Sequence, residues 1–186
     1  MSELSERIAS LSQEKRELLE KLLRKGGVSR QRPAVIPRAG REQTLPLSFA
    51  QQRLWFLDQL EPGNPFYNIS SPIRFNSAVN MDALRESLTE IIRRHEILRS
   101  SFALVDDQPA QIVASSLDLP LPFIDLSGLA PLEREREASR LASLEAQHAF
   151  DLARGPLVQA KLVRLSEEQH ILLLTMHHIV SDTWSL

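Results

Sequence analysis

A chain of 186 residues, 42% hydrophobic and 25% charged, has the composition of a globular protein that can bury a sizeable core. It has no cysteine, which excludes disulfides and thiolate chemistry, and no apolar run near the roughly 20 residues of a membrane span, so we expect a cytoplasmic protein. The net charge of −2 combines a basic start, with ten Lys/Arg against five Glu in residues 1–41, and a body with 12 Lys/Arg against 19 Asp/Glu.

Residues 1–25 are expected to be helical, because their apolar side chains recur at mostly helical spacing until Gly26 and Gly27 end the pattern. Such a segment can pack on its own domain, act as a docking element for another protein, or be only a linker. The pattern leaves these alternatives open. Residues 26–44 are rich in Pro, Gly and Arg without an apolar period, which is typical of a linker.

The body, residues 45–186, opens with a helix and a strand. Ser48 and Gln51 form the S-x-x-Q capping box of a helix that ends before Pro62. The stretch YNISSPIRFN then alternates between apolar and polar residues, which predicts a strand. Its polar face carries Arg74.

Further helices and strands follow in alternation. Asn80 caps an amphipathic helix, ILRSSFALV and AQIVA predict a hairpin around Asp106 and Asp107, and Pro131 begins a helix that runs to about His148. The stretches LVQAKLVRL and QHILLLTMH predict two strands joined by the polar turn SEEQ. This order, with the continuous apolar run ILLLTM, predicts an α/β layer fold with a buried central strand.

Two histidines, His177 and His178, stand where this buried strand is expected to emerge. Neighbouring strand residues point in opposite directions, so one imidazole can be held inside while the other faces a cavity. Asp182 is close enough to orient the following loop, by accepting backbone N–H bonds or by pairing with a cation. Catalytic, structural and metal roles remain open, the metal being the weakest because no third ligand follows at a familiar spacing.

Three stretches, in order, resemble motifs of nonribosomal peptide synthetase condensation domains. TMHHIVSDTWS is similar to their H-H-x-x-x-D-G motif, SFAQQRLWFL to their first motif and RHEILRSSF to their second, while FDLARGPLVQAKL resembles the segment before the histidine strand. The resemblance spans residues 45–186. It implies the N-terminal, donor-side half of a chloramphenicol acetyltransferase-like domain, a mixed sheet with flanking helices.

The resemblance implies amide formation, in which the amine of an acceptor aminoacyl thioester attacks a donor thioester carbonyl. Both substrates would be held on the phosphopantetheine arms of carrier proteins, with no cofactor or metal bound directly. By motif position, His178 is the expected catalytic residue and His177 a structural one. Asp182 would organise the loop through an arginine, for which Arg74 is the candidate. This half alone is expected to be inactive.

Other interpretations stay open beside this one. They are a non-catalytic carrier-docking module, and an epimerase or O-acyltransferase of the same superfamily. Residues 1–25 would dock an upstream synthetase, and nothing indicates a nucleic-acid or membrane partner. Thr183 stands where the motif usually has glycine, and a positive φ there would strain it by roughly 1 to 3 kcal/mol. His95 and Arg99 are interpreted as capping, packing or ion-pair residues.

Overall fold

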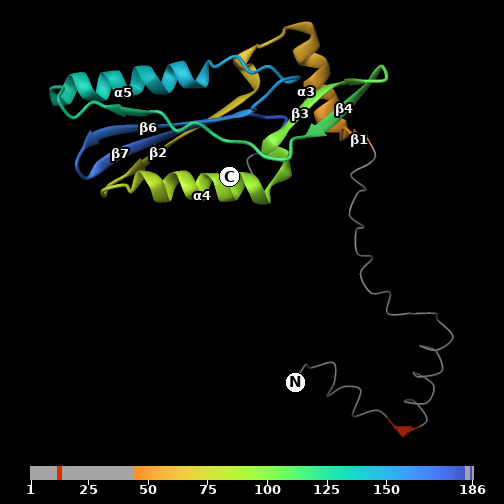
Figure 1. Cartoon of the computed structure of the whole chain (residues 1–186), viewed down its shortest axis with the longest axis horizontal. Coiled ribbons are helices and arrows are strands. Elements are labelled where there is room, and N and C mark those ends of the chain that lie inside the picture. The colour runs from red at the N-terminus through yellow and green to blue at the C-terminus, as the bar shows by residue number, and fades with distance from the viewer. Residues whose placement is uncertain (1–11, 14–43, 183–184, 186) are drawn as a thin grey trace. The chain divides into compact units, whose positions relative to one another are not determined.

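The structure is a computed structural model that describes residues 12–13, 44–182 and 185. The expectations for residues 1–25, for the linker before residue 44 and for Thr183 therefore lie almost entirely outside the described residues. No helix in the described part of the chain is long and apolar enough to cross a membrane. The elements of residues 44–182, labelled as in Figure 1, are β1 (Leu45–Pro46), α3 (Phe49–Leu60), η1 (Pro65–Tyr67), β2 (Asn68–Phe75), α4 (Met81–Arg94), η2 (Glu96–Arg99), β3 (Ser100–Val105), β4 (Gln108–Val113), β5 (Phe123–Asp125), α5 (Pro131–Ala146), β6 (Val158–Ser166) and β7 (Gln169–His177).

The main sheet has the strand order β2-β7-β6-β5. Strand β7 is antiparallel to both of its neighbours, β2 and β6, while β5 is parallel to β6, so the sheet is mixed. Helix α5 covers one face and α4 the other (Figure 1). A second sheet, in the order β1-β4-β3, lies at the same end as α3. The α/β class and the buried central strand predicted from the sequence are confirmed.

The helices begin at the capping residues that the sequence indicates. In α3 the Ser48 hydroxyl accepts the Gln51 N–H, and the Gln51 side chain accepts the Ser48 N–H, which completes a capping box. Asn80 accepts two N–H groups of the first turn of α4, and Pro131 is the first residue of α5. Each of these helices is thus specified locally.

The β3–β4 hairpin turns at Asp106 and Asp107, which have φ angles of 50° and 59°. Two consecutive residues with positive φ are the geometry of a two-residue turn that matches the twist of the strands. Aspartate tolerates this conformation better than most residues other than glycine and asparagine. The predicted hairpin is confirmed, whereas the short strands β1 and β5 carry too little pattern to be predicted.

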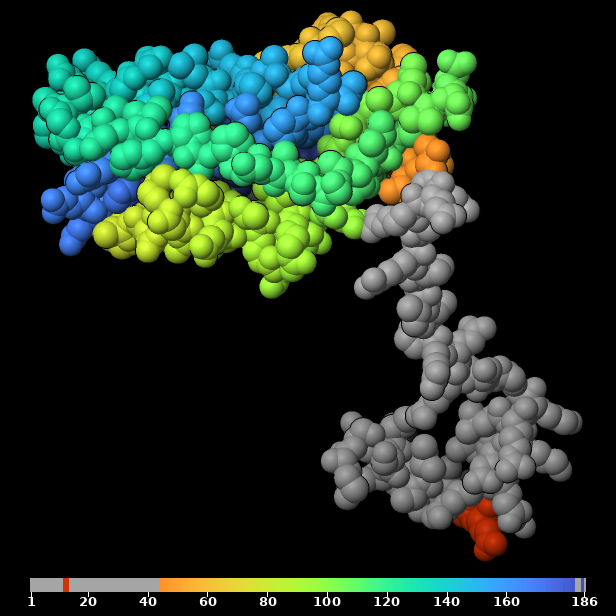
Figure 2. All heavy atoms as spheres, in the orientation of Figure 1, coloured from red at the N-terminus to blue at the C-terminus, as the bar shows by residue number. Residues whose placement is uncertain are grey.

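Two hydrophobic clusters lie on the two faces of the main sheet. Alternate residues of β7 divide between them: Leu172 and Met176 pack in the cluster that includes Ile92 of α4, and Ile171 and Leu173 in the cluster of α5. The segment between β4 and α5 crosses the molecule between the two helices (Figure 2). Strand β7 is therefore enclosed on both faces and paired on both edges, as a nearly continuous apolar run requires.

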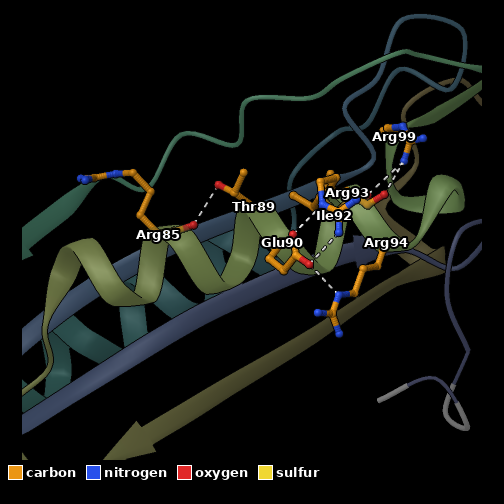
Figure 3. Close-up of polar contacts among 7 residues, drawn as sticks. All are labelled: Arg85, Thr89, Glu90, Ile92, Arg93, Arg94 and Arg99. Carbon is orange, nitrogen blue, oxygen red and sulfur yellow. Dashed lines mark hydrogen bonds and ion pairs between the residues drawn. The ribbon is translucent and has the colours of Figure 1, made fainter.

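Arg99 joins the end of α4 to the end of β4. Its side chain, only 12% exposed, donates to the carbonyls of Ile92 at 3.3 Å, Arg93 at 3.1 Å and Ala114 at 2.8 Å, and pairs with Glu96. Figure 3 shows the guanidinium directed at the last turn of α4, where carbonyls lack helical partners. Arg94, by contrast, is an exposed partner of Glu90.

We expect Arg99→Ala to lower the free energy of unfolding by about 2 to 3 kcal/mol, because it leaves carbonyls at the end of α4 without their charged donor. Urea unfolding of this chain measures the loss. Arg94→Ala is the matched control and should change stability by no more than about 0.5 kcal/mol, since its ion pair is exposed. Equal losses in the two variants would contradict this role of Arg99.

Candidate active site

The chain leaves the main sheet at the pair of histidines. The N–H of His177 donates to the Leu157 carbonyl at 3.0 Å, and the N–H of His178 donates to the Tyr67 carbonyl at 2.8 Å. The His177 residue is 3% exposed, whereas His178 is exposed. Strand β7 ends at His177, so this imidazole lies inside, while His178, the first residue of the following turn, lies outside; one inner and one outer imidazole is what the sequence predicts.

His177 is a neutral, buried imidazole whose tautomer is set by the backbone. Its Nδ1 accepts the N–H of Ile179 at 3.2 Å, so the ring proton lies on Nε2. The rings of Phe150 and Tyr67 lie 6.3 Å and 6.5 Å away, centroid to centroid. Burial, aided by the neighbouring His178, lowers the pKa of His177 to about 4. At pH 7 His177 therefore carries no charge.

The loop after His178 is held by hydrogen bonds on several sides. The Val180 N–H donates to the His177 carbonyl at 3.1 Å, and the Ile179 carbonyl accepts from Gln51 Nε2 at 3.4 Å. Asp182 Oδ1 accepts the N–H of Ser185 at 2.9 Å and its hydroxyl at 2.6 Å. Asp182 thus orients the following turn by accepting a backbone N–H, one of the two ways that the sequence suggested.

Arg74 lies far from this loop. It is paired in register with Ile171, while Asn68, six residues earlier on β2, is opposite His177, a separation of roughly 20 Å along the strand. Its guanidinium makes two hydrogen bonds to Glu135 of α5, at 3.1 Å and 2.8 Å. The expectation that Arg74 meets Asp182 is therefore wrong, because strand register places the two at opposite ends of the sheet.

Two hollows lie beside the histidine loop. One, of about 180 Å³, is lined by His177 together with Asp58 and Tyr67. The other is a largely apolar groove of about 470 Å³ between α4 and the main sheet, and it reaches Val180 and Ser181. Among residues 44–182 no group of three or more His, Asp or Glu side chains is arranged to hold a metal ion.

Three residues that surround the histidines were not predicted from the sequence to belong to this site. Tyr67 and Phe150 flank the His177 ring, and Gln51 reaches the loop from α3. Gln51 and Phe150 lie within stretches that resemble family motifs, so a signal was present. Their contacts could not be read from it, because they join segments that lie far apart in the chain.

Residues 41–186 match the family model of the condensation domain. The chain is 44% identical over all 186 residues to phosphinothricin tripeptide synthetase PhsC of Streptomyces viridochromogenes, and 49% identical over 146 residues, 78% of its length, to a linear gramicidin synthase of Brevibacillus parabrevis. The crystal structure of the starter condensation domain of rhizomide synthetase RzmA superposes with a TM-score of 0.70, at 26% identity over 76% of this chain. The chain therefore belongs to the condensation-domain family and has its chloramphenicol acetyltransferase-like fold.

The chain is much shorter than these relatives. It spans 17% of the length of PhsC, 3% of the linear gramicidin synthase and 35% of the RzmA structure. Family membership is therefore shown for residues 41–186, which are part of a longer protein in these relatives.

Because His177 is buried and neutral, we expect the free energy of unfolding to decrease as the pH is lowered. The unfolded chain binds a proton at His177 with the ordinary pKa of about 6.5, the folded chain only near 4, so stability is lost as the pH falls through this window. The loss should reach about 3 kcal/mol at pH 4. His177→Asn retains an acceptor for the Ile179 N–H but cannot titrate, so it should be less stable at pH 7 yet flatter in its pH dependence.

Urea unfolding at pH values between 4 and 7 measures this difference. His95→Asn, at an exposed histidine, is the control and should keep the wild-type slope. An unchanged slope in His177→Asn would show that His177 is not the group responsible.

Proposed function

We propose that this chain is the donor-side part of a condensation domain that forms amide bonds in nonribosomal peptide synthesis. The observation that carries the proposal is the exposed His178 imidazole on a loop held by hydrogen bonds at the exit of the central strand. The acceptor's α-amine attacks the donor thioester carbonyl, the C–N bond forms, and the carrier thiol leaves. The amine must lose a proton in this step.

In this proposal His178 accepts that proton or holds the amine by a hydrogen bond. An imidazole is the side chain whose ordinary pKa lets it act as a base near neutral pH. Two hydrogen bonds fix the backbone around His178. One runs from its own N–H to the Tyr67 carbonyl, and the other from the Val180 N–H to the His177 carbonyl. Positioning the amine by a hydrogen bond and accepting its proton both use this same group.

His177 acts in this proposal as a structural residue. Since it is neutral and its Nδ1 is occupied by the Ile179 N–H, it neither competes for the proton nor places a second charge next to His178. Asp182 holds the turn that follows through its bonds to Ser185. The two histidines thus have different tasks because only one of them meets solvent.

The substrates and partners follow from the family in this proposal. In this proposal carrier proteins deliver donor and acceptor on phosphopantetheine arms, and no cofactor is bound directly. The similarity to a tripeptide synthetase and to a linear gramicidin synthase supports a role in peptide assembly. The reaction needs both arms positioned at once, and well-oriented reactions gain about 7 to 11 kcal/mol from positioning. The 186 residues by themselves supply one wall of such a site and are proposed to be inactive alone.

We expect His178→Ala, in a complete condensation domain, to lower the rate of dipeptide formation by about 100-fold or more, because general acid–base groups contribute at least this much. Product is followed by mass spectrometry with loaded donor and acceptor carriers. The melting temperature should stay close to that of the wild type, since His178 is exposed.

His177→Ala is the matched control and should mainly reduce stability, because it removes a buried ring and the acceptor of the Ile179 N–H. Undiminished product from well-folded His178→Ala would remove His178 from the mechanism. Absence of product from the wild-type domain itself would favour the non-catalytic docking module.

Residues 1–25 are proposed as a docking element for an upstream synthetase, joined by residues 26–44 to the condensation half-domain, residues 45–186. Support comes from the helical spacing of their apolar residues and from the ten Lys/Arg against five Glu in residues 1–41, which would attract an acidic partner.

Deleting residues 1–25 from the complete protein should therefore weaken acyl transfer from an upstream carrier while leaving a small soluble thioester donor unaffected. Product formation with the two donors, at low and high salt, makes the comparison, because screening should weaken the first only. Equal losses with both donors would mean that the segment only stabilises the fold.

A further inference from the structure

The Gln51 side chain makes two hydrogen bonds, one within the cap of α3 and one that joins α3 to the histidine loop. Its Oε1 accepts the Ser48 N–H at 2.9 Å, and its Nε2 donates to the Ile179 carbonyl at 3.4 Å, across 128 residues of sequence. A backbone N–H can only donate and a carbonyl can only accept, so the two partners together determine which end of the amide is oxygen. One side chain therefore serves two segments.

Gln51 contacts the residue directly after His178, at its carbonyl. The Ile179 N–H is bound by His177 Nδ1 at 3.2 Å and its carbonyl by Gln51, so side chains from two elements hold this residue at both polar groups. The His178 N–H is bound separately, by the Tyr67 carbonyl. The backbone on both sides of His178 is thus fixed while its ring is exposed.

A capping box alone does not require glutamine at this position. Glutamate at the third helical position accepts the same N–H equally well, so the cap explains an acceptor and not a donor. Within residues 44–182, the donor half of the amide is used by the Ile179 carbonyl alone. The choice of glutamine in SFAQQRLWFL is therefore explained by the loop and not by the helix.

We propose that Gln51 is a positioning residue for His178, acting through the Ile179 carbonyl. This inference rests on the proposed function of His178. Gln51 does not touch the substrates in this proposal, and it sets the place and the rigidity of the loop from which the imidazole extends. Small displacements of a catalytic group reduce the rate without weakening substrate binding.

Gln51→Glu separates the two tasks of this side chain. The carboxylate still accepts the Ser48 N–H, so α3 keeps its cap, but it has no donor and repels the Ile179 carbonyl. In this chain, hydrogen exchange of the Ile179 and Val180 amides should become about tenfold faster, the loss expected from one hydrogen bond. Amides in the first turn of α3 should keep their exchange rates.

Two neighbouring variants serve as controls. Gln52→Glu changes the next residue of α3, whose amide donates to the Leu47 carbonyl at 3.1 Å and not to the loop, so exchange at Ile179 should stay at the wild-type rate. Ser48→Ala removes the acceptor of the Gln51 N–H and should speed exchange at the start of α3 while leaving the loop unaffected.

In a complete condensation domain, Gln51→Glu should lower kcat about tenfold, with KM for both carrier-bound substrates within about twofold of wild type. Ser48→Ala should instead lower the melting temperature and leave kcat close to wild type. Exchange and kcat in Gln51→Glu that match those of Gln52→Glu would overturn the proposal. The exchange result does not depend on catalysis, so a failure of His178→Ala to reduce product would be recognised separately.

Discussion

The enclosure of β7 is the constraint on which the rest of this structure depends. The strand is hydrogen-bonded on both edges and covered on both faces, so every side chain between Ile171 and Met176 meets protein. Water cannot solvate a polar group in such a place, and a polar residue there needs a partner from the protein. At the end of the strand His177 has this partner in the Ile179 N–H, which lets the chain turn outward directly after a buried position.

The same burial explains why two adjacent imidazoles behave differently. Desolvation disfavours the charged form of His177 and keeps it neutral across the range in which an ordinary histidine titrates. Its single N–H then lies on Nε2, because Nδ1 accepts from the backbone. The inner histidine therefore contributes shape and a hydrogen bond to the loop, and the outer one remains available for chemistry.

The loop depends on elements that are distant in sequence. Tyr67 comes from η1, Leu157 from the segment before β6 and Gln51 from α3, and each contributes one polar group to residues 177–179. Arg99 makes a comparable connection elsewhere, between α4 and β4. In both places a stretch that resembles a family motif supplies a hydrogen-bond donor to carbonyls. These motifs thus hold separate elements of the fold together.

The sequence by itself determined the parts of this protein that local chemistry decides. The caps at Ser48 and Asn80, the turn at Asp106 and Asp107 and the apolar run of β7 depend on residues within a few positions of each other, so their structures could be predicted. The opposite exposure of His177 and His178 was predictable because the apolar run of β7 ends beside them, which places one at the end of the strand and the other in the turn. Tertiary structure decided which distant groups meet. Arg74 was assigned to Asp182 from its polar face, yet strand register pairs it with Glu135, and the contact of Gln51 with Ile179 exists only because α3 packs near the end of β7. Register and packing depend on the whole chain, and no local pattern contains them.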